Sequence, residues 1–239
     1  MMIRLDKFLA NMNVGSRSQV HEIIKHGHVT VNGKTCRTAK EKIGEKDFVE
    51  VDGKKIIYQE YHYFMMNKPK GVLTATEDSD QKTVLDLISL KDRYKNLSPV
   101  GRLDKDTTGL LLLTNDGQLN HHLLAPDFHV AKVYKSLIAG IVTQEEIIKF
   151  KNGIVLKDGT KLKSAVLKIL NTDLKNKQSI VEITIIEGKY HQIKRMFGSV
   201  GMKVLELERL QMGKLILDSN LKLGDYRELT SKEVALLKK

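Results

Sequence analysis

A run of four leucines, Leu110–Leu113, constrains the fold of this chain more than any other segment. It is bounded by Gly109 on one side and by the turn-forming sequence Asn115-Asp116-Gly117 on the other. A short, fully apolar run between turn signals is typical of a buried strand that ends in a turn. With 239 residues, the chain is long enough to enclose such a strand in a sizeable core.

The chain that surrounds this run mixes strand and helix patterns. Apolar or alternating stretches predict strands at 63–69, 130–139 and 180–186, and a weaker one at 161–170. Capping boxes at Thr143–Glu146 and Thr230–Glu233 predict the starts of two helices. Because strands often follow one another directly, we expect an α+β domain whose mixed sheet is largely antiparallel and flanked by helices.

The first 58 residues predict a small separate unit. A capping box at Ser16–Gln19 predicts the start of its second short helix, and Asn32-Gly33 and Asp52-Gly53 each predict a hairpin turn. Two short helices followed by a small β-ribbon make a compact unit. We therefore divide the chain into domains 1–58 and 59–239.

An excess of positive charge favours a polyanionic partner. The chain has 40 Lys and Arg against 29 Asp and Glu, a net charge of +11, of which +4 lies in the first 58 residues and +7 in the rest. Nucleic acid is the first candidate, and a basic, well-solvated protein is the alternative. No apolar run approaches the roughly 18 residues of a membrane helix, and the N-terminus does not resemble a signal peptide. The lone Cys36 excludes an internal disulfide framework and indicates a reducing cytoplasm.

The loop before the leucines, residues 101–109, is the most distinctive stretch. Its acidic spacing partly matches a calcium loop, but Asn115 stands where a bidentate glutamate is required and Leu112 fills a ligand position with an apolar group. Two interpretations remain: a charged loop before a buried strand, or a reactive carboxylate, Asp104, held at the end of that strand. An ionised aspartate can act as a nucleophile without a base to activate it. Arg102 is within reach of a phosphate or a base stack.

A tyrosine between cations, Tyr134, is the second candidate. If 130–139 is a strand, alternation places Lys132, Tyr134 and Ser136 on one face. Such a tyrosine can stack on a base, or it is an ordinary half-buried strand residue.

The third candidate is the segment 187–197. Its apolar spacing predicts a helix whose opposite side gathers His191, Lys194 and Arg195. This side is either a solvated charged face or the source of a cation that pairs with a carboxylate in the site. Neither a nucleotide-binding glycine loop nor a zinc-ligand spacing is present, so we expect no nucleotide cofactor and no metal.

Together these motifs resemble a known family. GRLDKDTTGLLLLTNDG is similar to the central motif of the bacterial pseudouridine synthases of the RsuA/RluB/RluE/RluF group, and residues 1–58 resemble the S4 RNA-binding domain that precedes the catalytic domain in most of that group. YFMMNKPKGV, KVY, EGKYHQIKRMF and GDYRELT extend the resemblance over essentially the whole chain. It implies conversion of uridine to pseudouridine in folded RNA: uracil is detached from N1, rotated and rejoined to the ribose through C5, with no metal or organic cofactor.

The resemblance also implies roles for single residues. Asp104 matches the catalytic aspartate, which attacks either the ribose C1′ or C6 of the base. Tyr134 matches the tyrosine that stacks on uracil and is a candidate for proton abstraction, and Lys194 matches the basic residue that pairs with the aspartate. Arg102 matches the group that enters the base stack when the target nucleotide flips out. Further candidates for RNA contact are His191 and Arg195 and, in the S4-like unit, Arg4, Lys7 and Arg17.

Within the group, the segment 190–195 is most similar to the member that modifies the 16S RNA of the small ribosomal subunit. Several large-subunit relatives carry arginine at the position of Lys194. We therefore expect a cytoplasmic, monomeric enzyme with no membrane association that acts on 16S ribosomal RNA in an assembling small subunit. The same chemistry on 23S RNA and a non-catalytic ribosome-assembly factor that binds RNA are the alternatives.

Overall fold

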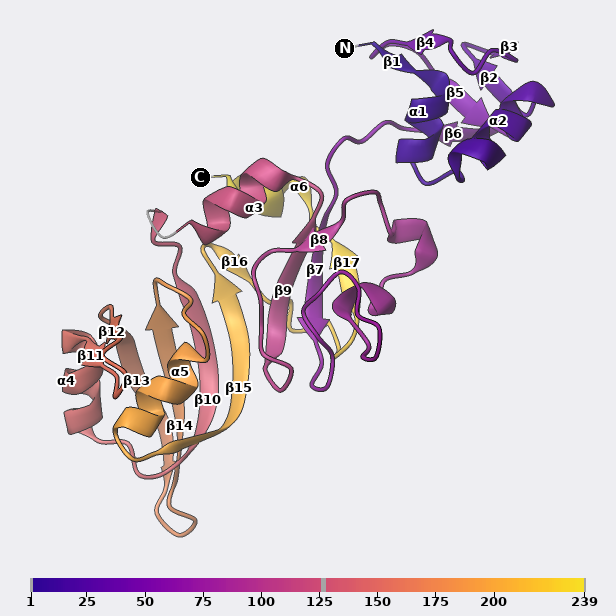
Figure 1. The fold of residues 1–239 in the computed structure, drawn as a ribbon. Coiled ribbons are helices and arrows are strands. Elements are labelled where there is room, and N and C mark those ends of the chain that lie inside the picture. The colour runs from indigo at the N-terminus through magenta and orange to yellow at the C-terminus, as the bar shows by residue number, and fades with distance from the viewer. Residues whose placement is uncertain (1, 126–127, 239) are drawn as a thin grey trace. The chain divides into compact units, whose positions relative to one another are not determined.

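The computed structural model describes residues 2–125 and 128–238 (Figure 1). The chain forms two compact units. One contains the chain up to His62 together with Ile88–Leu97, and the other contains Tyr63–Leu87 and the chain from Ser98 onward. The segment Ile88–Leu97 carries no sequence signal that assigns it to the first unit.

The first unit packs two helices against short strands. Its sheet has the order β3-β2-β5-β6, and β1 pairs separately with β4. The predicted capping box is present, with Ser16 accepting from the Gln19 N–H. Asn32 and Asp52 have positive φ and precede glycines that also have positive φ, as the predicted hairpin turns require. The elements are β1 (Ile3–Arg4), α1 (Leu5–Asn11), α2 (Arg17–Lys25), β2 (Val29–Val31), β3 (Lys34–Thr35), β4 (Lys42–Ile43), β5 (Val49–Val51) and β6 (Lys54–Ile56), with a 3₁₀ helix at Leu90–Asp92.

The second unit is built on a nine-stranded sheet. Its main path runs β13-β14-β10-β15-β9-β7-β17, with β16 beside β15 and β8 beside β9. Every neighbouring pair is antiparallel except β15 and β9, so the prediction of a largely antiparallel α+β sheet is confirmed.

The elements of the second unit are β7 (Tyr63–Lys68), a 3₁₀ helix (Val84–Leu87), β8 (Ser98–Pro99), β9 (Thr108–Thr114), α3 (Gly117–Leu124), β10 (Lys132–Ala139), α4 (Gln144–Asn152), β11 (Ile154–Val155), β12 (Lys161–Leu162), β13 (Val166–Asp173), β14 (Gln178–Ile185), α5 (Gln192–Ser199), β15 (Lys203–Met212), β16 (Leu215–Ile216), β17 (Tyr226–Glu228) and α6 (Ser231–Leu237). β11 and β12 form a separate two-stranded pair. The capping boxes predicted at Thr143 and Thr230 open α4 and α6.

The four leucines lie in β9 and are fully buried, as predicted. Leu110 and Leu112 belong to an apolar cluster that includes residues of β7, α3 and α6. Figure 1 shows α3 and α6 in the half of the sheet that contains β9, and α4 and α5 in the half that contains β10, β14 and β13. In that second group, Phe150 of α4 and Phe197 of α5 pack edge to face with ring centroids 5.0 Å apart. Helices therefore pack against both halves of the sheet.

The parallel pair joins two antiparallel halves of the sheet. Only two residue pairs form it, Glu208 with Thr108 and Arg209 with Gly109. Gly109 has φ +98°, and a Cβ placed there would lie 2.3 Å from the carbonyl oxygen of Arg209. Glycine at this position therefore allows the halves to meet, which sets the loop before β9 against β10 and α5.

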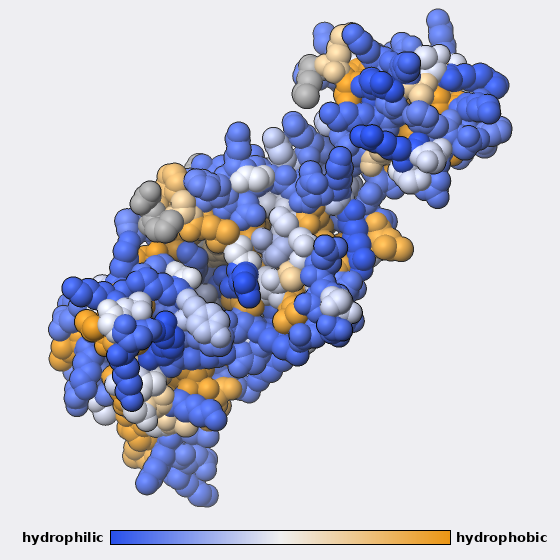
Figure 2. Space-filling model, in the orientation of Figure 1, coloured by the Kyte–Doolittle hydropathy of each residue, from blue (hydrophilic) through white to orange (hydrophobic). Residues whose placement is uncertain are grey.

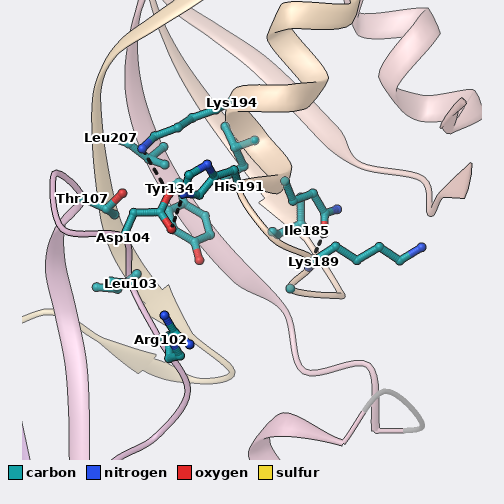
Figure 3. A pocket seen from close by; sticks show the side chains of 13 residues that line it. Arg102, Leu103, Asp104, Thr107, Tyr134, Ile185, Lys189, His191, Lys194 and Leu207 are labelled. Atoms are coloured by element: carbon teal, nitrogen blue, oxygen red, sulfur yellow. Dashed lines mark hydrogen bonds and ion pairs between the residues drawn. The ribbon is translucent and has the colours of Figure 1, made fainter. Parts of the chain in front are cut away.

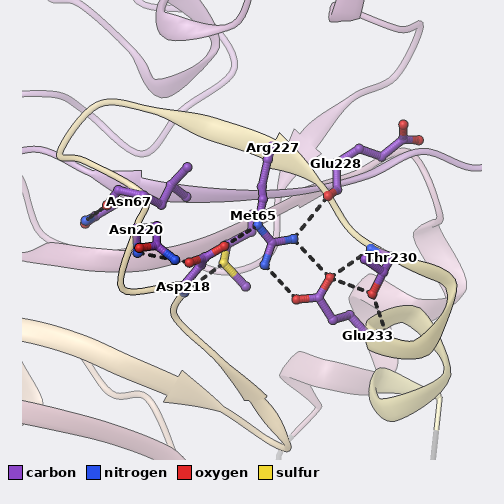
Figure 4. Close-up of polar contacts among 9 residues, drawn as sticks. Met65, Asn67, Asp218, Asn220, Arg227, Glu228, Thr230 and Glu233 are labelled. Atoms are coloured by element: carbon purple, nitrogen blue, oxygen red, sulfur yellow. Dashed lines mark hydrogen bonds and ion pairs between the residues drawn. The ribbon is translucent and has the colours of Figure 1, made fainter.

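At the edge of the sheet formed by β17, Arg227 connects the sheet to the C-terminal helix α6 (Figure 4). Its guanidinium donates to Asp218 Oδ2 at 2.8 Å and to both carboxylate oxygens of Glu233, at 2.7 and 3.0 Å. These hydrogen bonds lower the pKa of Glu233 to about 2, against the effect of burial. The same carboxylate accepts from the Thr230 backbone, so one arginine holds the start of α6 in place.

None of the helices among the described residues is long and apolar enough to cross a membrane. Figure 2 shows a mostly hydrophilic surface on the face in view, with apolar side chains in scattered groups.

Candidate active site

Asp104 lies in the loop that leads into β9 and faces the start of α5. Lys194 Nζ is 3.1 Å from Asp104 Oδ2 and 2.6 Å from Asp106 Oδ1, and His191 Nε2 is 3.5 Å from Asp104 Oδ1. In Figure 3 the Asp104 carboxylate points toward Lys194 and His191. The structure thus brings together Asp104 and Lys194, which the sequence places 90 residues apart.

The electrostatics of this cluster favour ionised groups. Burial disfavours the charged form of Lys194, but hydrogen bonds and charge from Asp106 and Asp104 outweigh it and raise the pKa of the ammonium. The hydrogen bond from Lys194 lowers the pKa of Asp106. The Asp104 side chain is 28% exposed. It is therefore oriented by a charged partner and still open to a substrate.

Lys68 is a buried lysine that the sequence did not single out, and it supports the backbone of the loop that carries Asp104. Lys68 is the last residue of β7, and it has no exposed surface. Its ammonium lies within 3.0–3.3 Å of four backbone carbonyl oxygens, those of Pro69, Asp104, Lys105 and Thr107. Three protons can satisfy at most three of them at a time. A cation at the end of a strand whose residues 63–66 are aromatic or apolar was the signal that could have identified it.

Burial lowers the pKa of Lys68 to about 8, although Asp106 and Asp104 favour its charged form. The ammonium therefore remains mostly protonated at neutral pH. It donates to the backbone carbonyl of Asp104 and not to its carboxylate, so its contribution is to position the loop.

Asp104 borders a small cavity of about 80 Å³, which we call the Asp104 cavity. Tyr134 of β10 lines it and is only 7% exposed, and Arg102 lies at its border. Lys132, Tyr134 and Ser136 are all buried, as the predicted strand alternation requires. In Figure 3 the Tyr134 ring lies beside the Asp104 carboxylate, and Arg102 lies on the side away from Lys194.

The cations of α5 divide between two places. The sequence analysis expected His191, Lys194 and Arg195 on one side of the helix. Lys194 and His191 do reach Asp104, but Arg195 forms an ion pair with Asp158. His191 precedes the helix with a left-handed φ of +47°. Arg195 is thus not among the residues that line the Asp104 cavity.

The backbone before α5 is held by an amide and a carboxylate. The side chain of Gln192 accepts from the Lys189 N–H at 2.9 Å and donates to Glu187 Oε1 at 2.9 Å. The same Glu187 oxygen accepts from the Lys163 N–H at 2.8 Å. These contacts fix the segment that presents His191 and Lys194.

The three cations predicted in the first unit line one hollow of about 480 Å³. Arg4 donates to Asp6 at 2.6 Å, and the pKa of Asp6 falls to about 2, chiefly through this hydrogen bond. In the described part of the chain, Lys7 and Arg17 have no carboxylate partner. The free positive charge of this hollow therefore comes mainly from Lys7 and Arg17.

The second unit thus gathers a carboxylate, a neighbouring ammonium and an aromatic ring around one cavity. Within residues 2–125 and 128–238, no cluster of three or more His, Cys, Asp or Glu side chains is arranged to hold a metal ion. The arrangement is suited to nucleophilic attack by a carboxylate on a planar substrate that stacks on the ring.

Known proteins are similar to this chain in sequence and in structure. Residues 62–199 match the family described as RNA pseudouridylate synthase, and residues 3–49 match the S4 domain. The chain is 46% identical to the uncharacterized RNA pseudouridine synthase YtzG of Bacillus subtilis, over 98% of both chains.

Two further relatives are 40% identical to this chain. Ribosomal large subunit pseudouridine synthase B of Bacillus subtilis matches over 99% of this chain and 96% of its own. Ribosomal small subunit pseudouridine synthase A of Salmonella typhimurium matches over 98% of this chain and 99% of its own. A crystal structure of a pseudouridylate synthase superposes with a TM-score of 0.67 at 36% identity, covering 98% of this chain and 99% of that chain.

Proposed function

Because the chain belongs to the RNA pseudouridylate synthase family, we propose that it isomerises one uridine of 16S ribosomal RNA to pseudouridine in an assembling small ribosomal subunit. The observation that carries the chemistry is the Asp104 carboxylate, held 3.1 Å from Lys194 at a cavity that Tyr134 lines. The 16S target is supported by the segment 190–195, which resembles the small-subunit member and has Lys194 where several large-subunit members have arginine.

In this proposal Asp104 is the catalytic nucleophile. It attacks either the ribose C1′ or C6 of the base, and the N1–C1′ bond breaks. The uracil then rotates, the C5–C1′ bond forms and the bond to Asp104 breaks, which restores the free carboxylate. The C5 proton is lost and N1 gains a proton, so substrate and product have the same composition. Lys194 orients the carboxylate, and Tyr134 stacks on the uracil and is the candidate that receives the C5 proton.

The target nucleotide must leave its stack before Asp104 can reach it. Extrusion of a base costs a few kcal/mol, and a side chain that fills the vacated space offsets part of this. Arg102, at the border of the Asp104 cavity, is placed for that role. His191 borders the cavity as well, whereas Arg195 would contact RNA only outside it.

The first unit holds the RNA in the proposal. Lys7 and Arg17, with Arg4 beside them, offer a basic hollow to the phosphate backbone, which gives affinity and register. We place the protein in the cytoplasm, where small subunits assemble, and expect it to act as a monomer.

A second candidate is the same reaction on 23S RNA. It is favoured by the 40% identity to a large-subunit synthase over 99% of this chain, as high as the identity to the small-subunit enzyme. The two targets differ only in the RNA that supplies the uridine.

Mapping of pseudouridines in 16S and 23S RNA, from cells with and without the protein, tests the proposal. We expect one 16S pseudouridine to disappear, and to return with the wild-type gene but not with Asp104→Asn. Loss of a 23S pseudouridine instead would select the second candidate. An unchanged pattern in both RNAs would refute both targets and favour a non-catalytic RNA-binding factor. Asp104→Asn should still bind RNA, because the substitution removes a negative charge and leaves the basic surfaces intact.

A further inference from the structure

A second and larger cavity, which we call the basic cavity, adjoins the Asp104 cavity. It measures about 620 Å³, and Arg102 and Tyr134 border both. The Asp104 cavity, at about 80 Å³, is well below the roughly 300–1,000 Å³ of most ligand sites. A nucleotide whose base stacks on Tyr134 must therefore extend its sugar and phosphate into neighbouring space, which the basic cavity provides.

The charged side chains that line the basic cavity are almost all cationic. Besides Arg102 it includes five cations, Lys132, Lys161, Lys163, Lys189 and Arg209. Glu187 is the one carboxylate among the described residues that line it. This carboxylate already accepts from the backbone of Lys163 and from the Gln192 side chain.

Two of these cations are buried beside each other. Arg209 is 2% exposed; its Nε donates to the Leu110 carbonyl at 2.7 Å, and its Nη2 has no hydrogen-bond partner. Lys132 is 8% exposed and donates to the Val130 carbonyl at 2.9 Å. Burial and, after it, the charge of Arg209 lower the pKa of Lys132. Within the described parts of the chain, neither cation has a carboxylate partner.

Buried like charges without a counterion are unfavourable, because each loses its hydration and each repels the other. An anion that enters the cavity would relieve both effects. It would also supply acceptors for the unpaired guanidinium group, whose planar donors match a phosphate.

We propose that the basic cavity binds the phosphodiester group next to the target nucleotide, with Lys132 and Arg209 as its buried ligands. The inference rests on the proposed function in one respect, that the target uridine occupies the Asp104 cavity. One cavity holds the base for the reaction, and the other holds the backbone that connects it to the rest of the RNA. Lys132 and Arg209 are then binding residues that position the nucleotide, and the bond changes remain with Asp104.

Lys132→Met tests the inference, because methionine retains the buried length of the side chain and removes the ammonium. Arg209→Lys is the second variant; it retains a charge but loses the planar fork. The matched control is Lys149→Met, which removes an exposed lysine of α4 that pairs with Glu145. Single-turnover rates of each variant are measured as a function of the concentration of 16S and 23S transcripts. RNA affinity is measured separately across a range of salt concentrations, with each variant carried in the Asp104→Asn background.

For Lys132→Met we expect half-saturation at about tenfold higher RNA concentration and a nearly unchanged saturating rate, since a charge-assisted contact is lost. The salt slope of log affinity should fall by about one relative to Lys149→Met. Arg209→Lys should weaken binding with its charge retained. Unfolding curves confirm that each variant is folded.

A synthetic RNA that carries a neutral methylphosphonate beside the converted uridine gives the decisive comparison. It should weaken wild-type binding more than it weakens binding by Lys132→Met, in which only Arg209 remains to contact that phosphate, whereas the same replacement several nucleotides away should affect both proteins equally. Equal affinities and salt slopes for Lys132→Met and Lys149→Met would overturn the inference. Absence of conversion by the wild-type protein on both RNAs, free and assembled into subunit particles, would refute the proposed function instead, and the affinity comparison would still decide the inference.

Discussion

Replacement of Gly109 by alanine is the most severe small change that the structure predicts. Gly109 sits in the two-residue parallel contact between β9 and β15, five residues after Asp104. A Cβ at this position would lie 2.3 Å from the Arg209 carbonyl oxygen and 2.7 Å from its backbone nitrogen. Both are main-chain atoms of the neighbouring strand, so no side chain can rotate away to relieve the clash.

The magnitude follows from two contributions. An L-residue at φ +98° is strained by about 1–2 kcal/mol. Ordinary contact begins near 3.4 Å, so the strands must separate by 3.4 − 2.3, or 1.1 Å. This separation disrupts the parallel pairing, at about 1 kcal/mol for each lost hydrogen bond. We expect Gly109→Ala to lower the free energy of unfolding by about 3–5 kcal/mol, a large part of a typical total of about 5–15 kcal/mol.

The same displacement should impair the chemistry. Asp104 belongs to the half of the sheet that contains β9, whereas Tyr134 and Lys194 belong to the half that contains β10 and β15. Misplacement of a reactive group by about 1 Å can lower a rate by about 10²-fold. We therefore expect such a loss of pseudouridine formation even at temperatures where the variant is folded.

Urea unfolding and single-turnover isomerisation measure the two effects. The matched control is Gly224→Ala, because Gly224 also has positive φ, +91°, but nothing lies within 4 Å of the added methyl group. The control should show only the backbone strain of about 1–2 kcal/mol and near-normal activity. If Gly109→Ala and Gly224→Ala lost equal stability and both remained active, the reasoning about the contact between β9 and β15 would be wrong.

Three further predictions concern charged groups. Lys194→Met should lower the saturating rate about 10²-fold with RNA binding largely retained, because Asp104 loses the cation that orients it, and Lys194→Arg should restore part of the rate. In the wild type, the free energy of unfolding should rise by up to about 3 kcal/mol between pH 8 and 10.5, because over this range the unfolded state binds more protons at Lys68 than the folded state does. Urea unfolding measured across this pH range should show no such rise for Lys68→Met. For Glu233 the free energy of unfolding also rises with pH, but between pH 2 and 4.5, because here the charged form is the stabilising one. Its stabilisation by Arg227 is present above pH 4.5 and is lost toward pH 2, about 2 kcal/mol after allowance for partial exposure, so Glu233→Gln should show a flatter acid unfolding profile.

Local signals in the sequence predicted local structure well. The capping boxes at Ser16, Thr143 and Thr230 form as expected, because each joins groups only three residues apart. The leucines of β9 were equally clear, since burial on both faces leaves a continuous apolar run.

The longest strand, Lys203–Met212, was not predicted, although the sheet depends on it. Its sequence mixes charged and apolar residues, so it resembles neither a buried run nor a simple alternation. Arg209 is buried in this strand because it donates to a carbonyl of β9, a partner 99 residues away in the sequence. Pairing of this kind depends on the tertiary fold, and no pattern within the strand reveals it.

The candidate site was predicted in part for the same reason. Helical spacing left open whether the cations of 187–197 form a solvated face or supply one that pairs with a carboxylate, and the family resemblance selected Lys194 and Asp104. Spacing did not separate Lys194 from Arg195, because their partners lie in different loops. The role of Lys68 was not predicted, because its acceptors are backbone carbonyls, most of them some 36–39 residues further along the chain.

The buried cations change what the net charge of +11 implies. Lys68 donates to the carbonyl of Thr107, just before β9, and Arg209 donates to the carbonyl of Leu110, within it. One comes from β7 and the other from β15, the two strands that flank β9. Positive charge therefore fixes the entry to β9 from both sides, which sets the Asp104 carboxylate in place. Part of the basic composition that favoured an RNA partner thus positions the one acidic group on which the proposed chemistry depends.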